Sequence, residues 1–184
     1  VYTWGLDSSA KLGGFTITHG LADVGGGMYN DHSLLMVTNC IFSYNQAYAG
    51  PGGGMYNKSA SPVVTNCIFY SNSSLPPTSW NYGEGGGMYN DNSSPTVTNC
   101  TFAVNDSGMS NINGSSPTIT NCIFYYNFHW GEDIINYDTS LPSISYCDLE
   151  KGCYPEGRNI NEDPQFIDPF SGDLHLRITS PCVD

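Results

Sequence analysis

The chain has 184 residues, with 17 acidic side chains against five lysines and arginines and a formal net charge of -12. This balance argues against nucleic acid or an anionic membrane surface as a partner, because both require clustered cations. There is no run of 18 apolar residues, so we predict no membrane insertion, and a chain of this length fits one domain. Because it starts at Val1 without a signal-like stretch, we expect a processed or trimmed mature segment.

A glycine-rich hexamer, Gly-Gly-Gly-Met-Tyr-Asn, occurs at 25–30, 52–57 and 85–90. Nine residues after the Asn of each copy comes an Asn-Cys step, and the Cys begins a Cys-x-Phe-x-x-Asn pattern. Aligned on that Cys, successive units are 27, 33, 22 and 25 residues long. The variation falls between the last Asn of one unit and the next glycine motif. Insertions at one point per unit predict a solenoid with its loops on a single side.

The segments around each Asn-Cys step, such as TVTNCTF and TITNCIFYY, are rich in β-branched and aromatic residues and predict short strands. We expect almost no helix, because no useful stretch has a 3.6-residue apolar period. Strand alternation turns the Cys, the Phe and the hexamer Met inward, and the Thr and the residue between Cys and Phe outward. The predicted fold is all-β, a right-handed parallel β-helix of about five to six coils over residues 1–147. Residues 148–184 are expected to form an irregular C-terminal cap of the same domain.

Asparagine recurs in three columns, which stacking would turn into ladders of side-chain amides. We expect left-handed backbone at the bends and hydrogen bonds along the axis. His19 is expected at the first-coil position of the third column. The columns are Asn30, Asn57, Asn90, Asn111 and Asn136; then Asn39, Asn66, Asn99 and Asn121; then Asn45, Asn72, Asn105 and Asn127.

The cysteines fall into two groups. One group forms an inward column of Cys40, Cys67, Cys100, Cys122 and Cys147. Parallel side chains in a column have poor bridge geometry, so we predict buried, reduced thiols that pack as small apolar groups. Cys153 and Cys182 lie outside the column and are the predicted disulfide, with Cys147–Cys153 as the alternative. Such a bridge would hold the C-terminal cap and suits an extracytoplasmic site.

With these patterns in view, the chain resembles a known group. The unit GGGMYN…SPTVTNCTFAVN is similar to the repeats of bacterial secreted and surface β-helix proteins, including chlamydial polymorphic outer-membrane autotransporters. The tail DPQFIDPFSGDLHLRITSPCVD resembles the closing segment of right-handed parallel β-helix repeat proteins of the choice-of-anchor type. The resemblance covers nearly all residues and implies the fold and an extracellular or cell-surface location. It implies no single function, because the group includes adhesins and other surface proteins.

An enzyme is one alternative, because several polysaccharide lyases and hydrolases use this fold. Such enzymes need clustered acids with basic partners. Here the lysines and arginines are scattered, and Asp31, Asp91 and Asp106 lie singly beside the corners. Thr18-His19-Gly20 is similar to a step of galacturonases, but the aspartate motifs that precede it there are missing. We therefore predict no catalytic residues.

The variable loops contain an aromatic set that the repeat brings to one side: Tyr48, Trp80, Tyr82, Phe128 and Trp130. Exposed aromatic rings in a stripe stack on sugar rings or anchor protein contacts. The alternative is that each ring packs on its own loop.

Acidic residues gather toward the C-terminus: Asp148, Glu150, Glu156, Glu162, Asp163, Asp168, Asp173 and Asp184. Calcium could bridge some of them, since it prefers several carboxylate and carbonyl oxygens. No spacing here matches a calcium loop, so we expect solvated acids, no metal and no cofactor.

Three functional hypotheses follow. The first is a non-catalytic extracellular structural solenoid. The sequence predicts no amphipathic helix to cover the first coil, so either further coils were cut away or that end docks on another copy and builds a head-to-tail fibre or matrix. The second is an adhesin or carbohydrate-binding protein that uses the aromatic loops to bind glycans. The third is a polysaccharide lyase or hydrolase.

Overall fold

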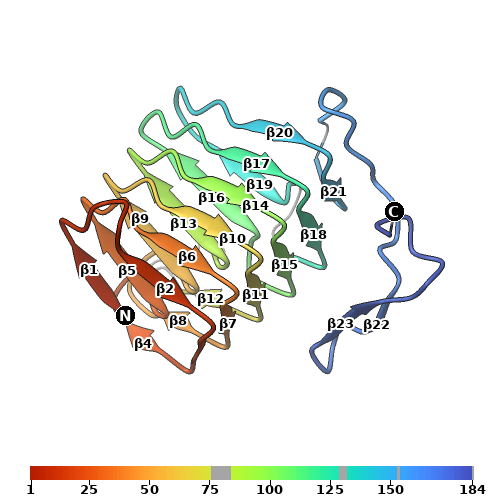
Figure 1. Cartoon of the computed structure of the whole chain (residues 1–184), viewed down its shortest axis with the longest axis horizontal. Coiled ribbons are helices and arrows are strands. Elements are labelled where there is room, and N and C mark those ends of the chain that lie inside the picture. The colour runs from red at the N-terminus through yellow and green to blue at the C-terminus, as the bar shows by residue number, and fades with distance from the viewer. Residues whose placement is uncertain (76–83, 129–131, 153, 184) are drawn as a thin grey trace.

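The computed structural model describes residues 1–75, 84–128, 132–152 and 154–183. These residues form β-strands, turns and bends without an α-helix, and none of them belongs to a helix long and apolar enough to span a membrane. Figure 1 shows successive coils stacked from the red N-terminus toward the blue C-terminal end. The predicted all-β solenoid is confirmed.

Three six-stranded parallel sheets form the sides of the stack, and each of six coils contributes one strand to each sheet. Sheet A contains β1 (Tyr2–Trp4), β5 (Met28–Asp31), β9 (Met55–Lys58), β13 (Met88–Asp91), β16 (Met109–Ile112) and β19 (Ile134–Asn136). Sheet B contains β2 (Lys11–Gly13), β6 (Met36–Thr38), β10 (Val63–Thr65), β14 (Thr96–Thr98), β17 (Thr118–Thr120) and β20 (Ser143–Ser145). Sheet C contains β3 (Thr16–Thr18), β7 (Ile41–Ser43), β11 (Ile68–Tyr70), β15 (Thr101–Ala103), β18 (Ile123–Tyr125) and β21 (Asp148–Leu149).

Two smaller sheets complete the described strands. A short three-stranded sheet follows sheet C in the first coils and contains β4 (Leu21–Ala22), β8 (Gln46–Ala47) and β12 (Ser73–Ser74). The C-terminal segment forms an antiparallel hairpin of β22 (Phe166–Asp168) and β23 (Asp173–Leu176).

The coils are in register, so each residue lies beside its counterpart in the next unit. Val64 of β10 pairs with Val37 of β6 and with Val97 of β14. Thr101 lies between Ile68 and Ile123 on the outer side of sheet C, as the repeat predicts.

The core is built from columns of identical side chains. Four fully buried phenylalanines form one column, and the ring centroids are 4.9, 4.6 and 4.6 Å apart from Phe42 to Phe124. Neighbouring rings are within 3° of parallel, which follows from the common backbone register. A second buried column contains the methionines of sheet A: Met28, Met55, Met88 and Met109, followed by Ile134. The predicted inward positions are therefore confirmed.

The glycine hexamer is half corner and half strand. Its glycines make the turn into sheet A, while Met-Tyr-Asn is already strand, as in β5. Gly25 has a φ of 61°, which glycine adopts without steric cost. Gly53 passes so close to the next coil that a Cβ there would lie 2.3 Å from the Ser73 carbonyl oxygen. The repeat thus preserves glycine for two reasons, backbone conformation and close approach.

The three asparagine columns differ from one another. Only the column at the corner between sheets B and C has left-handed backbone throughout, with φ of 53–54° at Asn39, Asn66, Asn99 and Asn121. These side chains are exposed. In the other two columns the left-handed residue is a neighbour, such as Tyr44 before Asn45. The expectation that every asparagine column marks a left-handed bend is therefore wrong for those two, whose amides instead lie inside the stack.

The two buried columns are hydrogen-bonded ladders. Asn30 donates to Asn57 at 2.7 Å, and the chain of amides continues to Asn136. In the third column, the Asn72 side-chain oxygen accepts from both nitrogens of Asn45, while its amide donates to Asn105 and to the Phe42 carbonyl. Every polar atom of such a side chain has a partner, which is the condition for burying it without loss of stability.

The first coil requires a one-residue correction. Strand β3 pairs Thr18 with Ser43, so His19 lies beside Tyr44 and their rings stack at 5.5 Å. Gly20 therefore takes the position of Asn45, and its backbone N–H donates to the Asn45 side-chain oxygen at 2.9 Å. His19 is a left-handed corner residue with a φ of 55°.

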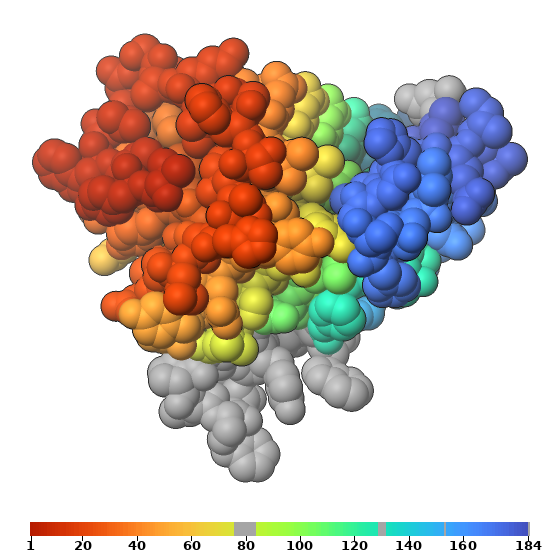
Figure 2. Space-filling view, turned by 90° about the horizontal axis from the view of Figure 1, so that it is seen from below, coloured from red at the N-terminus to blue at the C-terminus, as the bar shows by residue number. Residues whose placement is uncertain are grey.

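The C-terminal segment lies on the side of the stack as well as at its end. Strand β21 extends sheet C just past the predicted boundary at residue 147. The hairpin folds back over sheet C, where the Tyr70 hydroxyl donates to the Phe170 carbonyl at 3.1 Å. Figure 2 shows this blue segment packed against the side of the coils.

Truncating one ring of the phenylalanine column tests the stacking. We expect Phe102→Ala to lower the free energy of unfolding by about 3–5 kcal/mol, because the cavity lies between two rings that cannot close onto each other. The matched control is Thr101→Ala, which changes the outward neighbour on the same strand and should cost less than about 0.5 kcal/mol. Denaturant unfolding measures both. Equal losses would contradict the assignment of inner and outer faces.

Candidate functional site

The first coil presents an open edge of backbone groups. We call β1–β4 the first-coil edge. On its inner side the Ala10 carbonyl accepts from the Met36 N–H, and the Gly14 N–H donates to the Thr38 carbonyl. Because parallel pairing alternates along a strand, the backbone groups of Lys11 and Gly13 point the other way, out of the stack. An edge of this kind is a template for another strand.

Apolar side chains gather around this edge. Tyr2, Trp4, Phe15 and Leu21 are between 58% and 69% exposed. The inward residues Leu12 and Ile17 pack on the core but remain partly exposed, whereas their counterparts in the second coil are fully buried. The first-coil edge therefore combines free backbone groups with an uncovered end of the core.

The last coil is different, because residues 157–160 occupy several of its outward backbone groups. The Tyr146 N–H donates to the Gly157 carbonyl at 2.7 Å, and the Leu149 N–H donates to the Ile160 carbonyl at 3.1 Å. Over sheet B, the Asn159 amide donates to the Ile144 carbonyl at 3.2 Å. Parts of sheets B and C are thus covered by the chain itself.

Each internal ladder also ends on a polar group of its own. The Asn136 amide donates to the Tyr154 hydroxyl, which itself donates to the Ile134 carbonyl at 2.9 Å. Burial raises the pKa of Tyr154 to about 12, so it keeps this proton. In the cysteine column, the last backbone N–H, that of Cys147, donates to the side-chain oxygen of Asn159 at 2.9 Å.

Asp133 terminates the third ladder and is fully buried. The Asn127 amide donates to one carboxylate oxygen at 3.1 Å, and the Lys151 N–H donates to the other at 2.7 Å. Burial raises the pKa of Asp133 to about 7, although these two hydrogen bonds work in the opposite direction. The end of the ladder is therefore a titratable group close to neutral pH.

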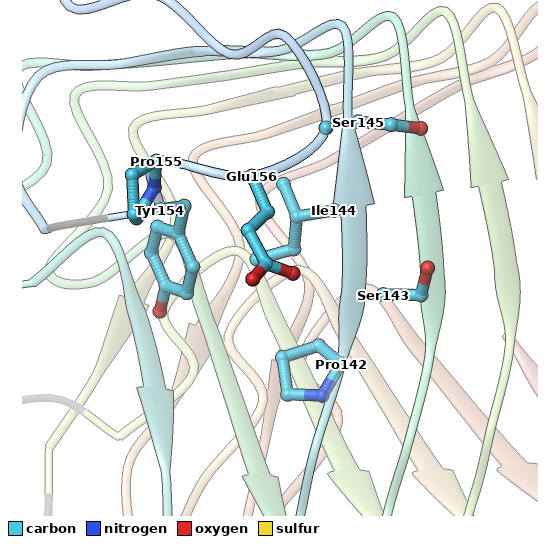
Figure 3. A pocket seen from close by; sticks show the side chains of 8 residues that line it. Pro142, Ser143, Ile144, Ser145, Tyr154, Pro155 and Glu156 are labelled. Atoms are coloured by element: carbon cyan, nitrogen blue, oxygen red, sulfur yellow. The ribbon is translucent and has the colours of Figure 1, made fainter.

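The covered end is not closed throughout. A depression of about 560 Å³ lies between β20 and residues 154–157. Figure 3 shows Glu156 between Ile144 and Tyr154, with its carboxylate turned toward the space beside Pro142. The walls of the depression contain one carboxylate among aliphatic and hydroxyl groups. These groups do not form a set of acid, base and nucleophile.

The predicted aromatic stripe is only partly within the described residues. Tyr48 and Phe128 are exposed, at 51% and 60%. They lie in the second and fifth coils, since Tyr48 follows β8 and Phe128 follows β18, so the structure does not bring these two together. Trp80, Tyr82 and Trp130 lie outside the described residues, and binding by the set stays a prediction.

The cysteine column is as predicted, and the disulfide is not. Cys40, Cys67, Cys100, Cys122 and Cys147 are free and buried. Burial raises the pKa of Cys122 well above its usual value, which keeps it a thiol. Cys182 is also free, and its thiol lies 3.1 Å from the Asp148 carboxylate, so neither the Cys153–Cys182 bridge nor the Cys147–Cys153 alternative is formed. Cys153 itself lies outside the described residues.

Two of the single acids beside the corners accept hydrogen bonds from neighbouring coils. Asp91 accepts from the Tyr56 hydroxyl and the Asn113 amide, and Asp106 accepts from the hydroxyl of Ser73. Within the described ranges, no three His, Cys, Asp or Glu residues are grouped so as to hold a metal ion. The expectation of solvated C-terminal acids without bound calcium stays a prediction, and Asp184 lies outside the described residues.

Comparison with protein families matches residues 6–157 to the right-handed β-helix region. The chain belongs to this right-handed β-helix family. No curated protein and no solved structure matches it. For a right-handed β-helix the fold alone names no activity, because function depends on local sites. The finer likeness to polymorphic outer-membrane repeats and to choice-of-anchor proteins stays a prediction.

Two features of this β-helix were missed from the sequence. One is Asp133, which stands where earlier coils have the last glycine of the motif, as Gly108 does before Met109. Ile134 aligns with the methionines in the sequence, so the position before it could be placed, but the burial of an acid there was not recognised. The other is the return of the hairpin over sheet C, for which no local signal was recognised.

The buried carboxyl predicts a pH dependence. A folded pKa raised from 3.8 to about 7 contributes stability that is fully present below pH 3.8 and is lost as pH rises through 7. We expect the wild-type free energy of unfolding to fall over this window by a few kcal/mol more than that of Asp133→Asn, at roughly 1.4 kcal/mol per pKa unit. Denaturant unfolding at several pH values measures the difference.

The matched control is Glu132→Gln, which removes the exposed carboxylate next to Asp133. It should keep the wild-type slope. If Asp133→Asn has that same slope, Asp133 does not titrate in the window.

Proposed function

We propose that this chain is a non-catalytic structural β-helix of the extracellular space or cell surface, which associates with a second copy of itself through the first-coil edge. The observation that carries the proposal is the contrast between the first and the last coil of the described residues. The first-coil edge has outward backbone groups and exposed Trp4 and Phe15, while the last coil has Tyr146 and Leu149 already paired to the chain's own residues. The extracellular or cell-surface location rests on the resemblance of the repeats to bacterial secreted proteins.

The chemistry of the exposed edge supports a β-helix coil as the occupant. A strand laid against β2 would bond with the outward groups of Lys11 and Gly13, and its apolar neighbours would cover Leu12 and Ile17. A second copy offers these same groups. About a two-fold axis, β2 would run antiparallel to its counterpart, with Lys11 opposite Gly13, which separates the two lysines.

The covered last coil favours a closed pair over the head-to-tail polymer that the sequence suggested. A polymer needs a free edge at both ends. At the far end, Gly157 and Asn159 already bond to Tyr146 and to the Ile144 carbonyl. An incoming strand would have to displace them.

The internal use of the polar groups supports a structural role. The corner acids Asp91 and Asp106 serve as hydrogen-bond partners of the neighbouring coil, Asp91 for Tyr56 and Asp106 for Ser73. Rigid stacking of this kind suits a spacer or a matrix component.

The oligomeric state tests the proposal. Sedimentation velocity over a concentration series should give a dimer for the wild type and a monomer for the double variant Phe15→Lys, Leu21→Lys, because buried lysines at the contact would lack partners. The matched control is Ile178→Lys, which places a lysine at a 90% exposed position in the C-terminal segment and should leave the dimer intact.

Negative-stain microscopy separates the alternatives. Particles of twice the monomer length, absent in the double variant, support the pair. Fibres would support the head-to-tail polymer instead of the pair. A wild type that stays monomeric throughout the concentration series would contradict self-association in either form.

A further inference from the structure

The outer face of sheet C carries a second feature, which is an aromatic cavity under the C-terminal hairpin. At the end of the strands of this sheet, Tyr70 and Tyr125 flank the small residue Ala103. Ala103 faces outward yet is only 1% exposed between these two larger side chains. The turn of the hairpin is held by a hydrogen bond from the Tyr70 hydroxyl to the Phe170 carbonyl.

The walls of the cavity are aromatic rings from two different parts of the chain. Tyr125 and Tyr126 come from the end of β18, and their centroids are 4.3 Å apart with the planes at 67°. From the hairpin, Phe166 lies 6.1 Å from Tyr125, and Phe170 lies 4.9 Å from Tyr126. The space between these rings is partly open to solvent and has a volume of about 340 Å³. That volume is at the lower end of the range for small-molecule sites, roughly 300–1,000 Å³.

Polar groups of both kinds line the same cavity. Asp163, Gln165 and Arg177 join the rings in its wall. The side-chain oxygen of Gln165 accepts from the Thr179 hydroxyl at 2.6 Å, which holds the amide in place and leaves its NH₂ as a donor. The Asp163 carboxylate is an acceptor, and the Arg177 guanidinium is a donor. Burial is the main reason why the pKa of Tyr125 is raised, so its hydroxyl stays protonated.

We propose that this cavity binds a single neutral pyranose ring, free or as part of a glycan. A sugar ring has an apolar C–H face, which stacks on aromatic rings, and a rim of hydroxyls that both donate and accept. The carboxylate and the guanidinium bring opposite charges to one cavity, so their sum suits a neutral ligand. An apolar ligand would contact the rings but would use none of the polar groups in the wall.

This site is separate from the surface on which the structural proposal depends. The cavity lies at the C-terminal end of sheet C, while the first-coil edge is formed by β1–β4 at the other end of the stack. It is also distinct from the loop aromatics Tyr48 and Phe128. A solenoid that pairs through its first coil would therefore carry two such cavities facing outward at opposite ends.

Saturation-transfer difference NMR on the full chain tests the proposal. The probes are methyl β-glucopyranoside, methyl β-galactopyranoside and methyl N-acetyl-β-glucosaminide, with cyclohexanemethanol as an apolar probe that lacks the ring of hydroxyls. At least one sugar should receive saturation, with ring C–H protons more strongly labelled than the methyl group. Cyclohexanemethanol should bind more weakly than that sugar.

Two variants and a matched control locate the site. Phe170→Ala removes one aromatic wall, and Arg177→Met removes a charged donor but keeps the aliphatic stem. Each should weaken binding about tenfold, the size of one lost charged hydrogen bond or one stacked ring. The control is Leu141→Ala, which removes an exposed apolar side chain that belongs neither to the cavity wall nor to the first-coil edge and should have no effect.

A second measurement guards against simple loss of the hairpin. The backbone amide of Gly172, which lies against the Tyr70 ring, should keep its chemical shift in Arg177→Met, so that weaker binding there reports the lost donor. The proposal is overturned if no sugar receives saturation, if cyclohexanemethanol binds as well as the sugars, or if both cavity variants bind like the wild type.

Discussion

The structure depends on one constraint, which is that backbone hydrogen bonds hold successive coils at a single spacing of about 4.8 Å. That spacing suits stacked aromatic rings, so Phe69 and Phe102 lie 4.6 Å apart and 1° from parallel. It also suits amides, and the bond between Asn57 and Asn90 is 2.8 Å. A residue type that satisfies one coil therefore satisfies the next. The repetition in the sequence is the direct result, because each column must accommodate copies of itself.

The same constraint makes the ends of the stack its weakest part. Each ladder needs a final partner for its last polar group, and the chain uses a different one each time: Asp133, the Tyr154 hydroxyl and the Asn159 amide. The use of Asp133 has a cost, since a buried carboxylate is poorly solvated and its pKa rises. The first coil has simpler terminations, such as the Thr3 hydroxyl that donates to Asn30 and the backbone N–H of Gly20. This asymmetry gives the molecule two chemically different ends.

The C-terminal segment acts on both the end and the side of the solenoid. Residues up to Ile160 extend the stack as an irregular further turn, while the hairpin returns over sheet C as far as Tyr70. Its contact uses outward positions at which the repeat varies, with tyrosine in some coils and Ala103 in another. The solenoid accepts either residue type at these positions, whereas the contact with the hairpin depends on which residue is present. This is where a repetitive scaffold gains a site that occurs once.

The sequence by itself determined the fold, the register and the inner and outer faces, because stacking in register makes every structural requirement periodic. Val37, Cys40 and Phe42 could be assigned inward from alternation and repetition alone. Only the tertiary structure decided which asparagine column bends the chain and which lies buried, since Asn39 and Asn45 recur with the same regularity but differ in backbone conformation. It also decided the closing of the last coil, the free thiol of Cys182 and the aromatic cavity. Each of these arises from a contact between a repeated position and a segment that is not repeated, so the repeat pattern in the sequence does not predict it.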